Sequence, residues 1–226
     1  MNDNLLNDAQ IVESWRKNAA PWIEAIRQQQ IESRKLVTDS AIAQAILSRS
    51  PSSVLDLGCG EGWLVRYLIQ KNIQATGVDA IEGLIANAKQ TLPANFQVLS
   101  YEEIIQGKLN ILVDVVVCNF SLFGREIVAQ LLQTIPRLIC PHGSLIVQTL
   151  HPVIACGQFP YQDGWREGSW SGFDSEFTSP PPWYFRTIAS WIQLFKDSGW
   201  KLIELSEPIH PTNKKPASII FVSQLA

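Results

Sequence analysis

Hydrophobic residues recur at helical intervals in the first part of the chain. Before residue 33, the residues Ile11, Trp15, Trp22 and Ile26 are spaced as a helix requires. Pro21 interrupts this run and is well placed in the first turn of a second helix. We therefore expect two short helices here, followed by a third that begins at residue 38 or 39 and ends at residue 49.

From residue 53 onward, short apolar runs alternate with amphipathic segments. The apolar runs lie at 54–57, 75–78, 96–99, 113–118 and 144–150, and helical periodicity covers 63–71, 82–91 and 127–139. Strands that alternate with helices form β-α-β units, in which parallel strands carry helices on both faces. The pattern therefore predicts an α/β, doubly wound, three-layer core.

This alternation stops after the fifth strand. Residues 151–185 show no clear period and contain many turn formers, which is typical of a functional lid or a disordered loop. Their aromatic residues argue against disorder. A helix is expected over 187–198, and strands at 201–205 and 218–222 could pair as an antiparallel hairpin at the sheet edge.

We accordingly divide the chain into four segments. These are an N-terminal helical cap (1–52), a core (53–150), an inserted lid (151–185) and a C-terminal helix and strand pair that complete the same domain (186–226). Seven of the eight tryptophans lie outside the core, and the remaining one is Trp63. The segments expected to cover the core are therefore rich in large aromatic residues.

Composition excludes several classes of protein. With 46% hydrophobic and 17% charged residues, the chain is not intrinsically disordered. A formal charge of −3 argues against the basic surface that binds nucleic acid. No apolar run reaches the 18 residues of a membrane span, and no signal-peptide pattern appears. We expect a monomer or homodimer that binds neither nucleic acid nor membrane.

The four cysteines and three histidines bear on location and metal binding. The cysteines are widely spaced and form no C-x-x-C pair, which indicates free thiols in a reducing cytoplasm. Three scattered histidines without paired cysteines argue against a structural zinc site. We therefore expect a cytoplasmic protein without a metal ion.

The strongest local signal follows the first core strand. Residues 56–62 read Asp-Leu-Gly-Cys-Gly-Glu-Gly, so a buried strand leads into three glycines at alternate positions and then into a helix. Glycine permits positive φ and close approach to a ligand, and a helix N-terminus offers free N–H groups. This predicts a ligand-binding loop at the carboxyl end of the strand, where open α/β sheets bind ligands.

Acidic residues near this loop indicate the chemistry of the ligand. The third glycine comes one residue earlier than in the dinucleotide-binding G-x-G-x-x-G pattern, and Asp56 and Glu61 disfavour an anionic pyrophosphate. The same two acids favour an ammonium group. Asp79 ends the next strand, where a carboxylate binds ribose hydroxyls. A nucleoside that carries an amino-acid group fits both observations.

These motifs resemble those of the class I S-adenosylmethionine-dependent methyltransferases. Residues 56–62 resemble the first motif of that family, Gly77-Val78-Asp79 resembles its second, and the likeness covers residues 53–150. The resemblance implies S-adenosylmethionine as cofactor and S-adenosylhomocysteine as product. It also implies a Rossmann-like, seven-stranded, mostly parallel sheet with an antiparallel last strand.

The resemblance further implies the residues that contact the cofactor. The loop would lie under the methionine part, Asp79 would bind both ribose hydroxyls, and Asn119 would face the methionine backbone and the methyl group. Ser100 and Tyr101 would flank the adenine. Arg34 would reach the cofactor carboxylate, or it is an exposed charge at a helix end. The acid that many members use at the adenine comes two residues late here, at Glu102. The full expected set is Asp56, Gly58, Cys59, Gly60, Asp79, Ala80, Ser100, Tyr101, Asn119 and Arg34.

The residues after the fourth core strand bear on the methyl acceptor. Family members that methylate exocyclic base amines carry Asn/Asp-Pro-Pro-aromatic there, whereas this chain has Asn119-Phe120-Ser121-Leu122. Pro181-Pro182-Trp183 resembles that motif but lies in the lid. Together with the net charge, this favours O- or N-methylation of a small molecule over a nucleic-acid base.

His151, at the end of the fifth strand, is our candidate base, because histidine titrates near neutral pH. Its alternative role is a hydrogen bond at the sheet edge, and His210 is a second candidate near the cleft rim. In the lid, acids outnumber bases, which favours a cationic or heteroaromatic acceptor. The alternative is that the lid rings only pack onto the sheet. The expected substrate contacts are Tyr161, Asp163, Trp165 and Arg166.

Two other functions stay open at this point. One is an NAD-dependent oxidoreductase, against which Glu61 and the early third glycine count. The other is a non-catalytic module that binds the cofactor without turnover.

Overall fold

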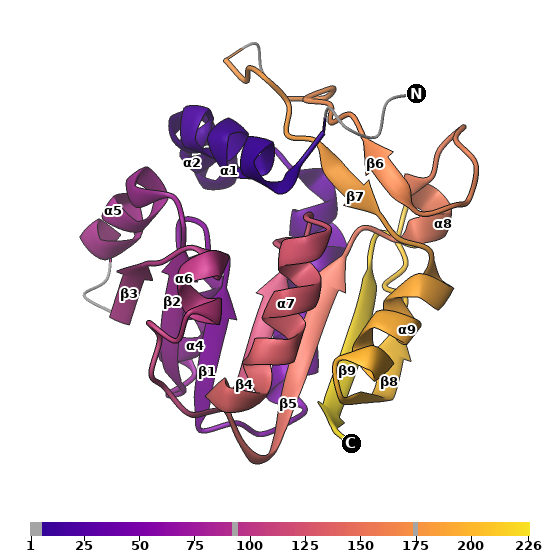
Figure 1. Cartoon of the computed structure of the whole chain (residues 1–226). Coiled ribbons are helices and arrows are strands. Elements are labelled where there is room, and N and C mark those ends of the chain that lie inside the picture. Colours follow the sequence, from indigo (N-terminus) through magenta and orange to yellow (C-terminus); the bar gives the residue numbers. More distant parts are fainter. Residues whose placement is uncertain (1–5, 92–94, 174–175) are drawn as a thin grey trace.

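A single twisted sheet organises the computed structural model, which describes residues 6–91, 95–173 and 176–226. Within these residues, seven strands form the sheet in the order β3-β2-β1-β4-β5-β9-β8 (Figure 1). All neighbouring strands are parallel except β9, which runs antiparallel to β5 and to β8. The predicted fold class and the terminal hairpin are confirmed. The strands are β1 (Ser53–Leu57), β2 (Gln74–Asp79), β3 (Asn95–Val98), β4 (Val113–Asn119), β5 (Ile139–Thr149), β8 (Trp200–Ser206) and β9 (Ile219–Leu225).

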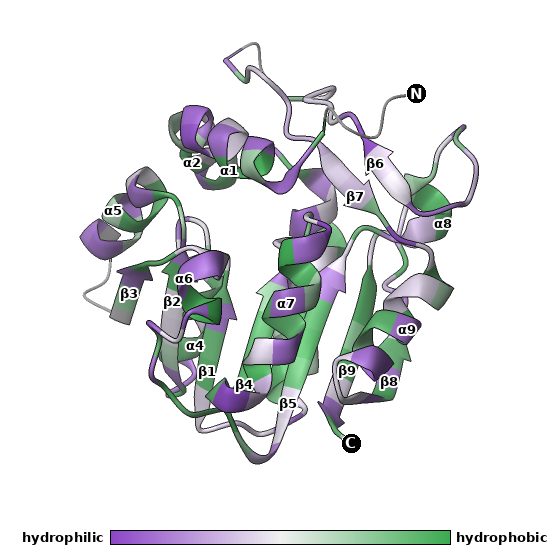
Figure 2. Cartoon of the chain, viewed as in Figure 1, coloured by the Kyte–Doolittle hydropathy of each residue, from purple (hydrophilic) through white to green (hydrophobic). Residues whose placement is uncertain are grey.

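Alternation within the strands explains the three layers. Val54 faces a buried cluster with α3 and α4, whereas its neighbour Leu55 faces a second cluster with α7 and α9. Successive side chains of a strand point to opposite faces, so a strand with helices on both sides reads as a continuous apolar run. Figure 2 shows the resulting hydrophobic strands at the centre of the molecule. The helices are α3 (Asp39–Leu47), α4 (Trp63–Gln70), α5 (Glu82–Thr91), α6 (Tyr101–Ile105), α7 (Glu126–Thr134) and α9 (Ile188–Asp197).

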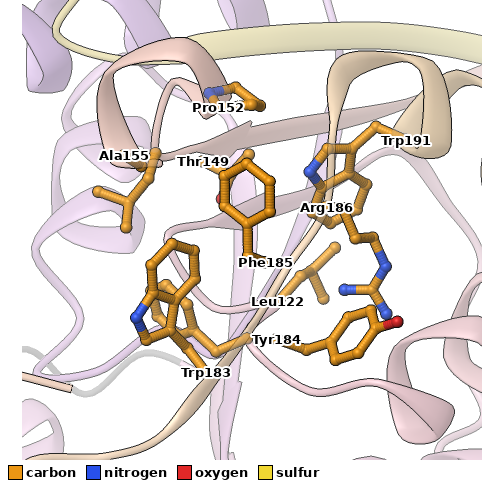
Figure 3. A pocket seen from close by; sticks show the side chains of 11 residues that line it. Leu122, Thr149, Pro152, Ala155, Trp183, Tyr184, Phe185, Arg186 and Trp191 are labelled. Atoms are coloured by element: carbon orange, nitrogen blue, oxygen red, sulfur yellow. The ribbon is translucent and has the colours of Figure 1, made fainter. Parts of the chain in front are cut away.

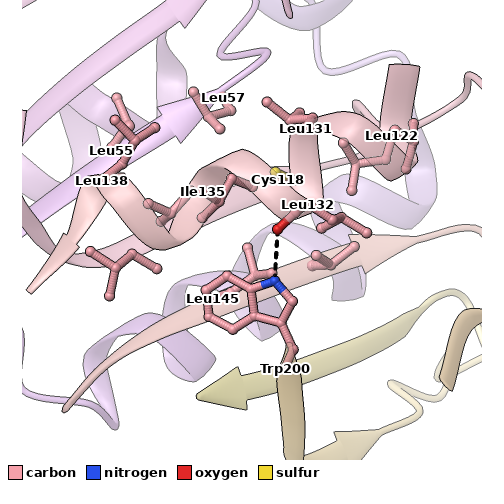
Figure 4. Packing of buried hydrophobic residues seen from close by; sticks show 14 of the residues in the cluster. Leu55, Leu57, Cys118, Leu122, Leu131, Leu132, Ile135, Leu138, Leu145 and Trp200 are labelled. Carbon is pink, nitrogen blue, oxygen red and sulfur yellow. Dashed lines mark hydrogen bonds between the residues drawn. The ribbon is translucent and has the colours of Figure 1, made fainter. Parts of the chain in front are cut away.

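The second cluster includes the buried indole of Trp200, which also makes a polar contact. Its Nε1 donates a 2.9 Å hydrogen bond to the carbonyl oxygen of Leu132, as Figure 4 shows among the surrounding leucines. A buried indole N–H needs such a partner. The bond joins the first residue of β8 to α7 and fixes the hairpin edge of the sheet to the core.

The boundaries differ from the sequence prediction in places with a local cause. The helix expected over 127–139 ends as α-helix at Thr134, and a 3₁₀ turn (η2, Ile135–Leu138) with Pro136 in its first residues follows. Proline has no N–H for the helix ladder. The next strand therefore begins at Ile139, earlier than expected. A π-helical turn (η1, Arg34–Thr38) precedes α3.

The lid is more regular than its sequence indicated. It contains a helix, α8 (Pro152–Ala155), and a two-stranded hairpin of β6 (Gly164–Arg166) and β7 (Trp183–Phe185). The hairpin strands lie 16 residues apart in sequence, so no short turn marked them as partners. The expected N-terminal helices are present as α1 (Asp8–Lys17) and α2 (Ala19–Arg27). Figure 1 shows these helices and the hairpin beyond the edge of the sheet where β1, β4 and β5 end.

Asn18, between α1 and α2, joins the N-terminal helices to the lid. Its side chain is fully buried, and its Nδ2 donates to the carbonyl oxygens of Ser14 (2.8 Å) and Thr178 (2.7 Å). Its Oδ1 accepts from the Thr178 N–H at 2.9 Å. Beside it, Trp15 meets Trp170 edge to face, with ring centroids 5.6 Å apart. The helices and the lid thus form one continuous cover, as the distribution of tryptophans indicated.

Candidate functional site

The glycine loop after β1 has a conformation that only glycine adopts easily. Gly58, Gly60 and Gly62 have φ values of +77°, +57° and +84°. A Cβ on Gly58 would lie 2.3 Å from the Ser121 Cβ, and one on Gly62 would lie 2.6 Å from the Phe96 ring. At Gly60 the nearest atom is the Trp22 Nε1, 3.7 Å away. Ser121 and Phe96 therefore pack closely against the loop, whereas Gly60 faces Trp22 of the cover.

Asp79, at the end of β2, fixes this loop. Its Oδ2 accepts the Gly60 N–H and its Oδ1 accepts the Ile81 N–H, both at 2.9 Å. Burial raises the pKa of Asp79, while these backbone hydrogen bonds act in the opposite direction. Ala80, between the two contacts, is half-buried. Asp79 therefore has a structural role at the loop, whether or not it also binds ribose.

Two buried oxygen atoms at the carboxyl ends of adjacent strands lack a partner among the described residues. They are the Oδ1 of Asp56 in β1 and the Oδ1 of Asn119 in β4. Asp56 is 2% exposed, and burial, with added repulsion from Asp79 and Glu61, raises its pKa to about 8. A ligand with a cationic N–H donor would satisfy such acceptors and favour the ionised Asp56.

Cations are also present beside the loop, and they are paired. Arg66 forms an ion pair with Glu61 and donates to the Glu61 carbonyl oxygen. The Nε of Arg34 lies 3.0 Å from Asp39 Oδ1, and its guanidinium lies 5.1 Å from the Trp63 ring centroid. The Arg34 side chain is 15% exposed, so it is not the solvent-exposed helix-end charge of the alternative interpretation. Its predicted contact with a cofactor carboxylate stays a prediction.

The residues after β3 have clear local roles. Ser100 caps α6: its Oγ accepts the Glu103 N–H, and its own N–H donates to Glu103 Oε2. The Tyr101 hydroxyl points beneath the glycine loop, 3.4 Å from the Leu57 carbonyl oxygen and 3.3 Å from that of Ser121. Any contact of Tyr101 with adenine would therefore involve its ring. Glu102 is exposed, and Cys59 is buried beneath the loop.

His151 follows β5 and is paired with an acid that sequence reasoning did not identify. Its Nε2 lies 2.6 Å from Oε1 of Glu207, which follows β8. The His151 side chain is 4% exposed, and its Nδ1 is buried without a partner among the described residues. The second candidate, His210, is buried as well, and its Nδ1 accepts the Thr212 N–H at 3.3 Å.

The four lid residues expected to contact substrate mainly hold the lid together. Asp163 accepts the Thr187 N–H at 2.8 Å and the Ser190 hydroxyl at the start of α9. Tyr161 accepts the Ile188 N–H, and Trp165 packs edge to face on Tyr184. Arg166 donates to the Pro160 and Gln162 carbonyl oxygens. Of the other lid acids, Glu167 and Glu176 are exposed, and Asp174 lies outside the described residues.

A cavity lies at the carboxyl ends of β4 and β5, against β7, and encloses about 10 Å³, enough for roughly one water molecule (Figure 3). Sequence reasoning overlooked Phe185, Arg186 and Trp191 in its wall, although the run Trp-Tyr-Phe after three prolines has the composition of a strand. A larger hollow at the opposite edge of the sheet has no titratable side chain in its lining. The cavity is lined by Leu122, Phe123, Thr149, Leu150, Pro152, Ala155, Trp183, Tyr184, Phe185, Arg186 and Trp191.

The described ranges contain neither a metal-binding cluster nor a membrane-spanning helix. In residues 6–91, 95–173 and 176–226, no three or more His, Cys, Asp or Glu side chains are grouped as a metal site requires. Over the same residues, no helix has the length and apolar character to cross a membrane. All four cysteines are free.

Comparisons with known proteins agree with the geometry of the loop. A family model described as a methyltransferase domain matches residues 27–205. Ubiquinone biosynthesis O-methyltransferase of Rickettsia typhi is 30% identical over 107 residues, which cover 45% of this chain and 42% of that protein. The match thus spans less than half the length of this curated relative.

Solved structures share the fold. An S-adenosylmethionine-dependent methyltransferase from Mesorhizobium loti superposes with a TM-score of 0.61 and 20% identity, over 80% of this chain and 95% of that chain. The 1,6-didemethyltoxoflavin-N1-methyltransferase of Burkholderia thailandensis superposes with a TM-score of 0.64 and 14% identity, over 92% of this chain and 87% of that chain.

Proposed function

Because the chain belongs to the family of S-adenosylmethionine-dependent methyltransferase domains, we propose that it methylates an oxygen or nitrogen atom of a small molecule. The observation that carries this proposal is the pair of unpartnered, buried oxygens on Asp56 and Asn119 beside the glycine loop. The described residues therefore fit a cofactor that carries an ammonium group. The similar proteins named above are an O-methyltransferase of ubiquinone biosynthesis and an N1-methyltransferase of 1,6-didemethyltoxoflavin.

Three groups of residues would hold the cofactor. The loop at Gly58 and Gly60 lets the methionine part approach the backbone, Asp56 and Asn119 accept hydrogen bonds from its amino group, and Asp79 lies where the ribose is expected. When bound, S-adenosylmethionine supplies the activated methyl group. The protein contributes alignment of the acceptor, exclusion of water by the cover, and removal of the acceptor proton where needed.

His151 and Glu207 provide the proton acceptor. With Nε2 hydrogen-bonded to Glu207, the imidazole proton resides on Nε2, and Nδ1 keeps a lone pair. Nδ1 is therefore the atom that would accept a proton from an acceptor hydroxyl or ring nitrogen. The Glu207 carboxylate stabilises the imidazolium that results, and it acts as a positioning residue.

The location and assembly of the protein are part of the same proposal. Four free cysteines are consistent with a reducing cytoplasm, and a small acceptor bound at one sheet edge requires no more than a monomer or homodimer.

Thermal-shift measurements with S-adenosylhomocysteine and with NAD test the cofactor. A ligand present at 100 times its Kd stabilises the folded state by about 2.7 kcal/mol. For a domain of this size, that corresponds to an increase in Tm of roughly 5–10 °C. We expect this increase with S-adenosylhomocysteine and none with NAD. The reverse result would establish the oxidoreductase alternative, and cofactor binding without turnover of any acceptor would establish the binding module.

A further inference from the structure

Arg186 is a buried cation in the wall of the cavity at the ends of β4 and β5. It follows β7 directly and is 6% exposed. Its guanidinium carbon lies 4.8 Å from the Tyr184 ring centroid and 5.1 Å from that of Trp191. Figure 3 shows the guanidinium between these two rings, next to Leu122. Aromatic rings thus cover the group, and hydrogen-bond partners must approach in its plane.

One end of this guanidinium lacks a partner. Nη2 donates a 2.9 Å hydrogen bond to the Arg125 carbonyl oxygen, whereas Nη1 is buried with no hydrogen-bond partner among the described residues. Burial lowers the pKa of Arg186 to about 10, so it remains protonated at neutral pH. A buried cationic N–H without an acceptor is costly in free energy. The site is therefore charged and incomplete as it stands.

The charged groups nearest to Arg186 are engaged elsewhere. Asp163 accepts hydrogen bonds from Thr187 and Ser190, and Asp8 accepts the N–H groups of Arg125 and Ile127. The guanidinium of Arg125 lies over the Tyr184 ring, against which Arg186 also packs, and it forms an ion pair with Glu126. No described acid lies within salt-bridge distance of Arg186. The described residues therefore supply no anionic partner for Nη1.

The chemistry around Nη1 favours a carboxylate on an aromatic body. A carboxylate accepts in-plane N–H groups of a guanidinium, and apolar and aromatic side chains such as Leu122, Trp183 and Phe185 form the adjacent wall. The cavity also includes Thr149 and Pro152, the near neighbours of His151 in sequence. A carboxylate here departs from the cationic acceptor that the acidic composition of the lid favoured, because the group left without a partner is the Nη1 of a cation.

We propose that Arg186 binds the carboxylate of the methyl acceptor, and that the acceptor is a small aromatic or heteroaromatic carboxylic acid. This rests on the proposed methyltransferase function and names its class of substrate. The enclosed volume of about 10 Å³ is too small for such a molecule, so binding of the acceptor requires the wall of the cavity to open.

Binding of matched acids and amides tests this assignment. The probes are benzoate, phenylacetate and indole-3-acetate, each compared with its uncharged amide by calorimetry on the full chain, with and without saturating S-adenosylhomocysteine. We expect at least one acid to bind about tenfold more tightly than its amide, because a charge-assisted hydrogen bond contributes roughly 1.5 kcal/mol or more. If no acid is preferred, Arg186 is a structural cation hydrated by water, and the proposal is wrong.

Substitutions at Arg186 and Arg125 distinguish the effect of the buried cation from that of its exposed neighbour. Arg186→Met should abolish the preference for the acid, whereas Arg125→Met, which removes the exposed cation over the same Tyr184 ring, should keep it. Should Arg186→Met fail to fold, Arg186→Lys replaces it; its altered donor geometry should reduce the preference about tenfold. A preference that persists in either Arg186 variant would overturn the proposal. Failure of the wild type to bind S-adenosylhomocysteine would instead count against the proposed function.

Discussion

The carboxylate of Asp79 holds the backbone of Gly60: its Oδ2 accepts the glycine N–H at 2.9 Å, across the gap between β2 and the loop after β1. The second oxygen, Oδ1, binds the N–H of Ile81. One side chain therefore sets the shape of the loop expected to carry the cofactor. A residue so placed affects binding even where it touches no ligand.

We expect Asp79→Ala to abolish the increase in Tm that S-adenosylhomocysteine gives. Loss of the carboxylate leaves the Gly60 and Ile81 N–H groups without their acceptors, which lowers the free energy of unfolding by about 1–3 kcal/mol per unsatisfied group. Thermal-shift and chemical unfolding curves measure the two effects separately.

Asp114→Ala is the matched control. Asp114 accepts the N–H groups of Ser52 and Ser53 at 2.8 and 2.9 Å, at the opposite edge of the sheet. We expect this variant to lose stability and to keep the full ligand-induced shift. If Asp79→Ala binds S-adenosylhomocysteine as tightly as Asp114→Ala does, the loop does not depend on Asp79.

The pKa of Asp56, raised to about 8 by burial, makes stability depend on pH. Between roughly pH 4 and pH 8, the folded state keeps this proton and the unfolded state does not. Stability from this group is therefore present at low pH and is lost as the pH rises toward 8. We expect Asp56→Asn to reduce the loss of stability between pH 5 and pH 8 that the wild type shows without ligand.

Binding of S-adenosylhomocysteine should lower the pKa of the Asp56 carboxyl, which burial raises. The ammonium group of the ligand favours the ionised carboxylate, so binding releases a proton, and affinity increases as the pH approaches 8. Calorimetry in buffers of different ionisation enthalpy measures this proton. If the wild type and Asp56→Asn release the same number of protons on binding S-adenosylhomocysteine, Asp56 does not respond to the ligand.

The core could be predicted from the sequence because the patterns that specify it involve residues close together in the chain. Val54 and Leu55 alternate between two helix layers, and the glycines at 58, 60 and 62 lie within one turn. The partners that complete the site are distant in sequence. Glu207 lies 56 residues from His151, and Thr178 lies 160 residues from Asn18. No periodicity links such pairs, since only the folded chain brings them together.

The four predicted substrate residues also show that contacts between distant parts of the chain cannot be predicted from local sequence. Tyr161 and Asp163 have chemically suitable groups, but these groups are engaged at the start of α9. Arg186, outside the predicted set, has a buried, unpartnered Nη1, and Arg166, within the set, has a buried, unpartnered Nε. Nothing in the local sequence distinguishes either residue from a surface arginine. Hydrogen-bond satisfaction depends on the tertiary structure, so the composition of the lid does not show which of its polar groups are free to bind a ligand.

For the proposed base, His151→Ala should reduce turnover by about 10²–10⁴ without changing the Kd of S-adenosylhomocysteine, once an acceptor is known. Glu207→Gln should reduce turnover less. His142→Asn, at an exposed position of β5 with φ of +66° that asparagine tolerates, is the control and should leave turnover unchanged. Full activity of His151→Ala would remove His151 from the mechanism.

Asn18 offers a way to loosen the cover without touching the glycine loop. Its side chain makes two hydrogen bonds to Thr178 and one to Ser14, all inside the junction of helices and lid. In Asn18→Ala, the Thr178 N–H loses its acceptor, which costs about 1–3 kcal/mol if the group stays buried, whereas the Thr178 carbonyl oxygen still accepts the Trp170 Nε1–H. Since the contact spans the cover and not the sheet, opening should be local.

We therefore expect Asn18→Ala to speed amide exchange at Thr178 and around Trp170, while the strands stay protected, and to increase the rate of S-adenosylhomocysteine release. Asn213→Ala is the control, because Asn213 accepts a single exposed hydrogen bond, from the Lys215 N–H of its own loop. Equal exchange in the two variants would mean that the aromatic contacts, such as Trp15 with Trp170, hold the cover closed without Asn18. Uniform loss of protection, extending into β4 and β5, would mean that the cover and the core unfold as one unit.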